Sequence, residues 1–212
     1  MSIKLKHSGG NSVSLNPPTS APTSSEVAFK LPTSDGTAGQ VLTTDGSGNL
    51  SWKTPGKILQ VVSTENTDTF STTSTSFADV TGFSVTITPS SSSSKILILT
   101  DAKCGTSTNL MNIYLRILRG STPVYVGDTA SNRQSCLFGM EDVDDSQGPY
   151  EMIQVSGNFQ DTPNTTSAVT YKLQYRVNDS SYTGYINRTG GDSDNINFPR
   201  TASSIIAMEV SA

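Results

Sequence analysis

The sequence predicts an all-β protein, an antiparallel jelly-roll-like sandwich preceded by an extended N-terminal arm and a short β-hairpin. Three observations lead to this prediction. From residue 57 onward, short runs of alternating apolar and polar residues recur, with clusters of turn-forming residues between them. No stretch of useful length has the period of a helix. The 33 serines and 28 threonines among the 212 residues suit outward strand faces and turns, because they add no charge repulsion there.

Residues 1–56 differ in composition from the rest and are predicted to form an attachment arm. They hold five of the ten prolines, and proline is excluded from central strands and helix interiors. Such a segment buries little apolar surface by itself, so we expect its apolar residues to add onto the sheet of another subunit or partner. These residues often stand two apart, the period of a strand: Ile3, Leu5, Val13, Leu15, Val27, Phe29 and Leu31.

The arm is predicted to end in a β-hairpin at about residues 40–52. Two short alternating runs flank the turn Asp45-Gly46-Ser47-Gly48, in which glycine supplies the positive φ of a tight turn. Trp52, the only tryptophan, is expected to seal this hairpin. Because a lone hairpin is marginally stable in water, we expect it to pack against neighbours.

Residues 57–212 are predicted to form the sandwich, a head domain of about 155 residues that can bury about two thirds of its unfolded surface. The alternation is clear in Phe83, Val85 and Ile87. The expected strands are Ile58–Val62, Phe83–Thr88, Ile96–Lys103, Met111–Arg119, Val124–Val126, Leu137–Met140, Met152–Phe159, Val169–Val177, Tyr182–Ile186 and Ser203–Val210.

Composition argues against several classes of protein. Charged residues make up only 15% of the chain and the formal net charge is −4, so no basic surface for nucleic acid is expected. No apolar run approaches the roughly 20 residues of a membrane span. The first seven residues carry lysines without an apolar run behind them, unlike a signal peptide. We therefore expect neither nucleic-acid binding nor membrane insertion.

Few residues are suited to catalysis or metal binding, and we predict no enzyme and no cofactor. His7 is the only histidine and lies in a polar segment before any expected core. Cys104 and Cys136 adjoin apolar runs and are expected to be small buried hydrophobes, although a disulfide between them stays open. Asp192 and Asp194 are weak candidates for a cation site, and the absence of a third carboxylate nearby favours a simple turn.

Two further sets of residues are candidates for contacts with other molecules. Tyr150, Tyr182 and Tyr185 lie near expected loops, where they would either stack on host glycans or pack in the core or an interface. The acidic run at residues 141–145 is expected to be a solvated loop, with an ion or receptor contact as the alternative. An oligomer interface is predicted from the apolar residues of two strands: Tyr171, Leu173, Tyr175 and Ile205.

Several phrases of the sequence resemble proteins of marine bacteriophages. Residues 31–52, LPTSDGTAGQVLTTDGSGNLSW, resemble a motif of tail-fibre and other virion proteins of these phages. The rear domain is similar to a family of such proteins with a C-terminal β jelly roll. The phrases that carry this similarity are DTFSTTSTSFADV at 68–80, ILRGST at 117–122, YINRTGGDSD at 185–194 and RTASSIIAMEV at 200–210.

The resemblance implies a non-enzymatic virion structural protein. It would be a homotrimer on the particle surface, joined to capsid or tail proteins through the N-terminal arm, with a β domain that contacts the host surface or its glycans. A tail fibre or spike and a capsid decoration protein both fit. The alternatives are a carbohydrate-binding module without a virion role and an enzyme acting on bacterial polysaccharide.

Overall fold

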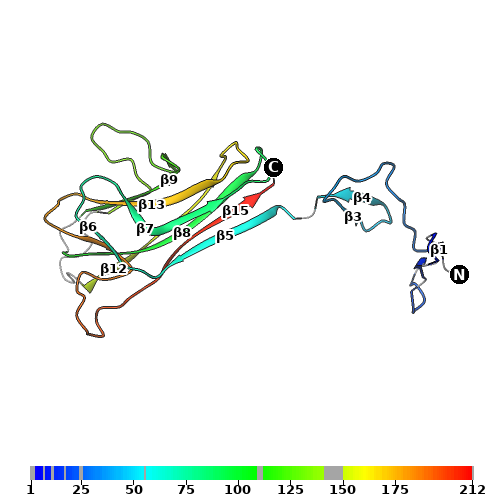
Figure 1. Ribbon diagram of the computed structural model, residues 1–212, viewed down its shortest axis with the longest axis horizontal. Helices are drawn as coiled ribbons and strands as arrows, with labels where there is room; N and C mark the ends of the chain where they lie inside the picture. Colours follow the sequence, from blue (N-terminus) through cyan, green and yellow to red (C-terminus); the bar gives the residue numbers. More distant parts are fainter. Residues whose placement is uncertain are drawn as a thin grey trace. The chain divides into compact units, whose positions relative to one another are not determined.

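The computed structural model describes residues 3–6, 8–10, 12–16, 18–23, 26–54, 56–108, 112–140 and 150–211. The chain forms two compact units, an N-terminal unit (Met1–Gly56) and a sandwich unit (Lys57–Ala212) (Figure 1). Every ladder between its strands is antiparallel, and the strands of the second unit form two packed sheets. The predicted class, an all-β antiparallel sandwich, is confirmed.

The N-terminal unit contains two separate two-stranded ladders. Strand β1 (Ile3–Lys6) pairs with β2 (Ser12–Leu15), with Ile3 opposite Leu15 and Leu5 opposite Val13. Strand β3 (Val41–Thr44) pairs with β4 (Leu50–Lys53). The hairpin expected at about residues 40–52 is therefore present, and the first part of the expected arm forms a hairpin of its own.

The first sheet of the sandwich is built around its longest strand, β8. Strand β12 pairs along one edge of β8, and β15 and then β14 pair along the other. Strand β5 lies outside β15, and β6 lies outside β14. The strands are β5 (Ile58–Asn66), β6 (Phe70–Thr72), β8 (Lys95–Thr106), β12 (Met152–Asp161), β14 (Gly184–Ile186) and β15 (Ser203–Val210).

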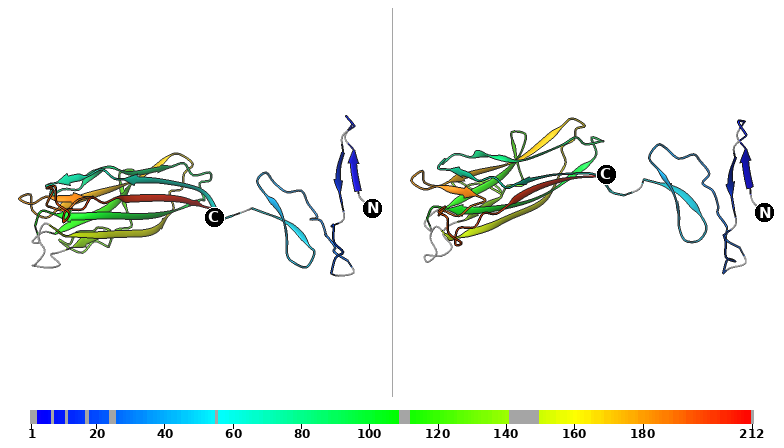
Figure 2. Two further views of the ribbon diagram at one scale, coloured as in Figure 1. Left: turned by 90° about the horizontal axis from the view of Figure 1, so that it is seen from below. Right: turned by 60° about the horizontal axis from the view of Figure 1, so that its bottom comes forward.

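The second sheet has the order β7-β13-β9, with β10 and β11 both at the far edge of β9. Its strands are β7 (Ala78–Ile87), β9 (Ile113–Arg119), β10 (Thr122–Val124), β11 (Phe138–Met140) and β13 (Val169–Val177). Figure 2 shows the strands of the two sheets running along the long direction of the sandwich.

The core lies between the two sheets and corrects one prediction from the sequence. Tyr171, Leu173, Tyr175 and Ile205 are each at most 1% exposed and belong to this core. The prediction that they form an oligomer interface is wrong, because the opposite sheet of the same chain already covers them. Alternation along a strand marks a face that is buried, and it does not say what buries it.

Side chains of β5 close one side of the sandwich by bonding to the backbone of β7. The Thr64 hydroxyl donates to the Ser84 carbonyl at 2.7 Å, and the Asn66 amide donates to the Thr81 carbonyl at 3.1 Å. These bonds satisfy carbonyl groups at the edge of the second sheet, which otherwise could pair with another chain.

The strand boundaries differ from the prediction at special backbone positions. Strand β7 begins at Ala78, five residues before the expected start, and continues through Gly82, whose φ of 77° requires glycine. Strand β10 ends at Val124 because Tyr125 has a φ of 51°. Strand β6 was not predicted, because its three residues include one apolar side chain, Phe70, and show no alternation. Met111, the expected start of β9, lies outside the described residues.

The two ends of the sandwich unit differ in character. The Ser211 amide donates to the Lys57 carbonyl at 2.7 Å, so the chain enters and leaves the sandwich at one end. The loops at 67–69, 178–183 and 187–202 lie at the other end, where β5 finishes (Figure 1). Nine residues of β5 separate the ends by about 30 Å.

Candidate attachment and binding surfaces

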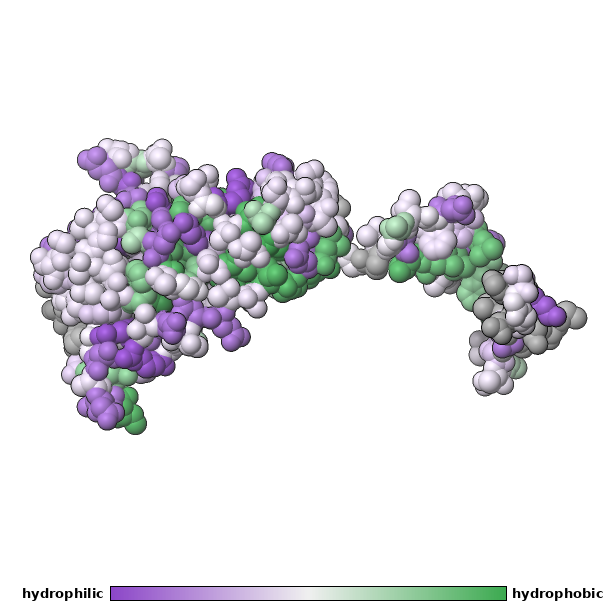
Figure 3. Space-filling model, viewed as in Figure 1, coloured by the Kyte–Doolittle hydropathy of each residue, from purple (hydrophilic) through white to green (hydrophobic). Residues whose placement is uncertain are grey.

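The N-terminal unit has two ladders and much exposed apolar surface. None of its residues whose burial is described is buried. Val27, Phe29 and Leu31 are 58%, 68% and 74% exposed, and Figure 3 shows hydrophobic surface on this unit. Phe29 and Val27 also line an open groove of about 770 Å³ together with Pro18 and Pro22. Three large apolar side chains at alternating positions are thus left in water, and burying them against a partner would be favourable.

The turn of the β3–β4 hairpin holds this apolar segment in place. Asp45 accepts hydrogen bonds from the Asn49 side chain and from the backbone amide of Ser47, and these bonds lower the pKa of Asp45. Gly48, with a φ of 86°, lies so near Ala28 that a Cβ would stand 2.7 Å from the Ala28 carbonyl oxygen. The Lys30 amide then donates to the Gly48 carbonyl at 2.8 Å. The glycine-containing turn therefore fixes the backbone from Ala28 to Lys30. This segment carries the exposed Phe29 and lies between the exposed Val27 and Leu31.

Trp52 covers a glycine in the same unit. Its indole Nε1 donates to the Ser34 carbonyl at 3.0 Å, and a Cβ on Gly36 would stand 2.6 Å from the ring. The ring is 36% exposed. Trp52 therefore joins the end of β4 to the segment at 34–36, which precedes the hairpin that it was expected to seal.

We expect Gly36→Ala to displace the Trp52 ring, because an added methyl group overlaps it. Trp52 is the only tryptophan, so the emission of the whole chain reports on this contact alone. The emission maximum should move to longer wavelength as the ring becomes more exposed. Gly127→Ala, with no heavy atom within 4 Å of the added Cβ, should leave the spectrum unchanged. An unshifted spectrum for Gly36→Ala would contradict the packing described.

The predicted glycan-contact tyrosines meet a long loop at the far end of the sandwich. Tyr150, 52% exposed, stacks on Phe198 with ring centroids 5.1 Å apart. Tyr185 lies beneath the guanidinium of Arg188 at 4.3 Å from the ring centroid, and Tyr182 packs against the core. Tyr150 therefore offers an exposed ring, while Tyr182 and Tyr185 are partly covered.

The candidate cation site is occupied by positive side chains. The Asp192 carboxylate forms an ion pair with Arg188 at 2.9 Å and a second one with Arg200. Two guanidinium groups compete with any cation for these oxygens. Asp194 is exposed in the same loop. In the part of the chain that the structure describes, no three His, Cys, Asp or Glu side chains gather closely enough to hold a metal ion.

The cysteines are poorly suited to nucleophilic chemistry. Both thiols are free, Cys104 is buried and Cys136 is partly buried. Burial raises the pKa of both thiols, and the thiolate is the form that acts as a nucleophile or metal ligand. His7 and the acidic run at 141–145 lie outside the described residues.

Sequence reasoning missed the side chains that contact Tyr150, Tyr185 and Asp192. Phe198, Arg188 and Arg200 were not singled out, although they determine how Tyr150, Tyr185 and Asp192 are placed. Tyr150 and Phe198 are far apart in the sequence, and no local pattern brings them together.

No family model matches the chain, and no curated protein matches it significantly. Among the described residues, no helix is long and apolar enough to cross a membrane.

Proposed function

We propose that the chain is a bacteriophage virion structural protein, a non-enzymatic homotrimer anchored by its N-terminal unit. The sandwich unit is displayed on the particle surface, and the anchor holds on to capsid or tail proteins. The observation that carries the proposal is the absence of any buried residue among those of the N-terminal unit whose burial is described. A segment that forms ladders yet leaves Val27, Phe29 and Leu31 in water is suited to completing its core on another protein.

The sandwich supports display by separating its attachment end from its loops. The chain enters the sandwich at Lys57. The loop at 187–202, whose Phe198 stacks on Tyr150, lies at the opposite end, about 30 Å along β5. An exposed aromatic ring at this end is suited to contact with a sugar on the host surface. Host adhesion is therefore the role that we assign to the loop end.

We infer that the sandwich is a jelly roll from the order of its strands. The long strands run β5-β15-β8-β12 in one sheet and β7-β13-β9 in the other, with β10 and β11 beside β9. Along the chain, β5, β7, β8 and β9 alternate between the sheets, and so do β12, β13 and β15. This alternation is the arrangement of two interleaved Greek keys.

The test of the proposal is incorporation of Phe29→Ser into particles. Particles are purified from a lysate in which the phage lacks its own copy of the gene and the protein is supplied from a plasmid. Losing the burial of one Phe side chain weakens a site by about 10- to 100-fold. The Phe29→Ser protein should therefore be nearly absent from particles, whereas Phe29→Leu, which keeps an apolar side chain, should be incorporated.

Two other outcomes would change the assignment. Equal incorporation of Phe29→Ser and the unmodified protein would reject attachment through the exposed apolar segment. Absence of the unmodified protein from purified particles, combined with binding to a panel of bacterial glycans, would favour a carbohydrate-binding module without a virion role. Antibody labelling of particles in the electron microscope then separates a tail fibre or spike from a capsid decoration protein.

A further inference from the structure

The outer face of the β5-β15-β8-β12 sheet is apolar in the half near Lys57. In β8 and β15 the buried residues alternate with partly exposed ones, so the partly exposed ones face outward. They form rows across the strands, with Met208 opposite both Val61 and Leu97. We call the set the apolar sheet patch; it comprises Val61, Leu97, Leu99, Ile206, Met208 and Val210.

The chain next to this patch is also apolar and strongly exposed. Ile58, Leu59 and Val61 at the start of β5 are 57%, 42% and 55% exposed. Figure 3 shows hydrophobic surface over the start of β5 and the end of β15. Contiguous apolar surface on several neighbouring strands is unusual on a monomer and marks an interaction site.

The outer face of the other sheet is different in character. Asp79 accepts hydrogen bonds from Lys172 and Gln174, each at 2.6 Å. Arg116 donates to Gln174 at 2.8 Å and lies 4.0 Å from the ring centroid of Phe77. This face is polar and its groups are paired with one another, so it is suited to water. The contrast shows that apolar residues are not spread evenly over the sandwich.

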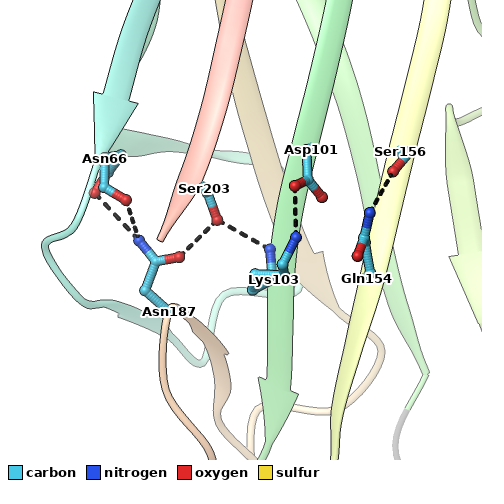
Figure 4. A network of polar contacts seen from close by, with 7 residues as sticks. All are labelled: Asn66, Asp101, Lys103, Gln154, Ser156, Asn187 and Ser203. Atoms are coloured by element: carbon cyan, nitrogen blue, oxygen red, sulfur yellow. Dashed lines mark hydrogen bonds and ion pairs between the residues drawn. The ribbon is translucent and has the colours of Figure 1, made fainter. Parts of the chain in front are cut away.

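The sheet face that holds the patch has the size and layout of one side of a protein interface. Its four strands of about ten residues span about 19 Å by 34 Å, or about 650 Å², near the roughly 800 Å² per partner of a standard interface, and the patch forms the apolar half of this face. Polar residues of β12 and β8 border the apolar centre, including Gln154, Ser156, Asp101 and Lys103 (Figure 4). An apolar centre with a polar rim is the usual anatomy of an interface.

The charges around the patch favour a second copy of this chain as the occupant. The strands carry two positive residues on this face, Lys95 and Lys103, and two negative ones, Glu65 and Asp101. Lys103 and Asp101 already form an ion pair at 2.5 Å. A face without net charge can approach its own copy without the repulsion that like charges would cause.

We propose that copies of this chain associate through the apolar sheet patch. The inference rests on the proposed function and names the surface that joins the subunits, in place of the core residues predicted from the sequence. Ile58 follows directly on the residue at which the sandwich begins, so association gathers the starting points of the attached N-terminal units. Several anchors held together bind a particle more tightly than one.

The experiment is sedimentation velocity of the full chain at micromolar concentration, with Met208→Lys and the matched control Ser84→Lys on the other sheet. The unmodified protein and Ser84→Lys should sediment as an oligomer of the 22.4 kDa chain. Met208→Lys should sediment as a monomer, with association weakened by about 30-fold or more, as at a buried interface centre. Val61→Lys, on the exposed edge strand, should act in the same direction and gives a second variant that the fold tolerates.

A monomeric unmodified protein would overturn the proposal, and so would association of folded Val61→Lys to the same extent as the unmodified chain. Circular dichroism establishes that each variant is folded. Because no particles are present, the result is independent of the attachment test. A monomer that is incorporated into particles would reject this inference and the trimeric state but leave the virion role standing, whereas an oligomer that is never incorporated would reject the virion role and leave this inference standing.

Discussion

Asn187→Ala is expected to lower the free energy of unfolding of the sandwich by about 4 kcal/mol, the largest effect of any change considered. Asn187 is fully buried and has a φ of 62°. Its side-chain amide donates to the carbonyls of Asn66 at 2.7 Å and Asp68 at 3.0 Å, and its oxygen accepts the Ser203 hydroxyl at 2.6 Å (Figure 4). Alanine leaves these groups unpaired in the interior and adds strain at positive φ.

The measurement is urea unfolding followed by circular dichroism, with two variants that separate the causes. Asn187→Gly removes the strain and keeps the loss of hydrogen bonds, so it should recover only about 1 kcal/mol. Asn164→Ala, at an exposed position with a φ of 53°, carries the strain alone. A loss for Asn187→Ala no larger than that for Asn164→Ala would show that the buried network contributes nothing.

The second large effect is expected from Gly105→Ala, which should destabilise the sandwich by about 3 kcal/mol. Gly105 lies in β8, where a Cβ would stand 2.3 Å from the Arg188 carbonyl oxygen and 3.1 Å from Thr189 Cα. Both obstacles are backbone atoms, so no side-chain rotation relieves the overlap. The segment after β14 must move away from β8, and the adjacent bond from the Asn187 amide to the Lys103 carbonyl would be strained.

Thermal unfolding measures this effect. For a domain of this size, about 3 kcal/mol corresponds to a fall in Tm of about 6–12 °C. The matched control is Gly127→Ala, where the added methyl group meets open space and Tm should stay unchanged. Equal Tm values for the two variants would mean that β8 and the segment after β14 are not in close contact.

The sequence carried enough information to predict the layers of the fold. Alternation in Phe83, Val85 and Ile87 identified residues that are all buried, and the Asp45–Gly48 turn identified the β3–β4 hairpin. These signals are local, because the period of a strand and the chemistry of a turn depend on neighbours in the sequence. The sequence therefore predicted most of the strands, the hairpin and the residues that face the core.

Contacts between distant segments could not be predicted in this way. Asn187 bonds to residues about 120 positions away, and Tyr150 stacks on Phe198. The strand order that brings them together depends on the packing of the whole sandwich. One signal for the apolar sheet patch was nevertheless present, since residues 96–99 form a continuous apolar run instead of an alternating one. Such a run is typical of a strand covered on both faces.

The bond between Ser211 and Lys57 has a consequence for how this protein can change over evolutionary time. The bond ties the first and last strands of the sandwich together at one end, and the loops at 67–69, 178–183 and 187–202 lie at the other. Ile196, at 98% exposure, stands in the longest of these loops and supports nothing in the core. Substitutions and inserted peptides at this position would be tolerated by the fold. The loop end can therefore vary in sequence without loss of the fold, and a foreign epitope grafted at residue 196 would be presented on the surface of the sandwich.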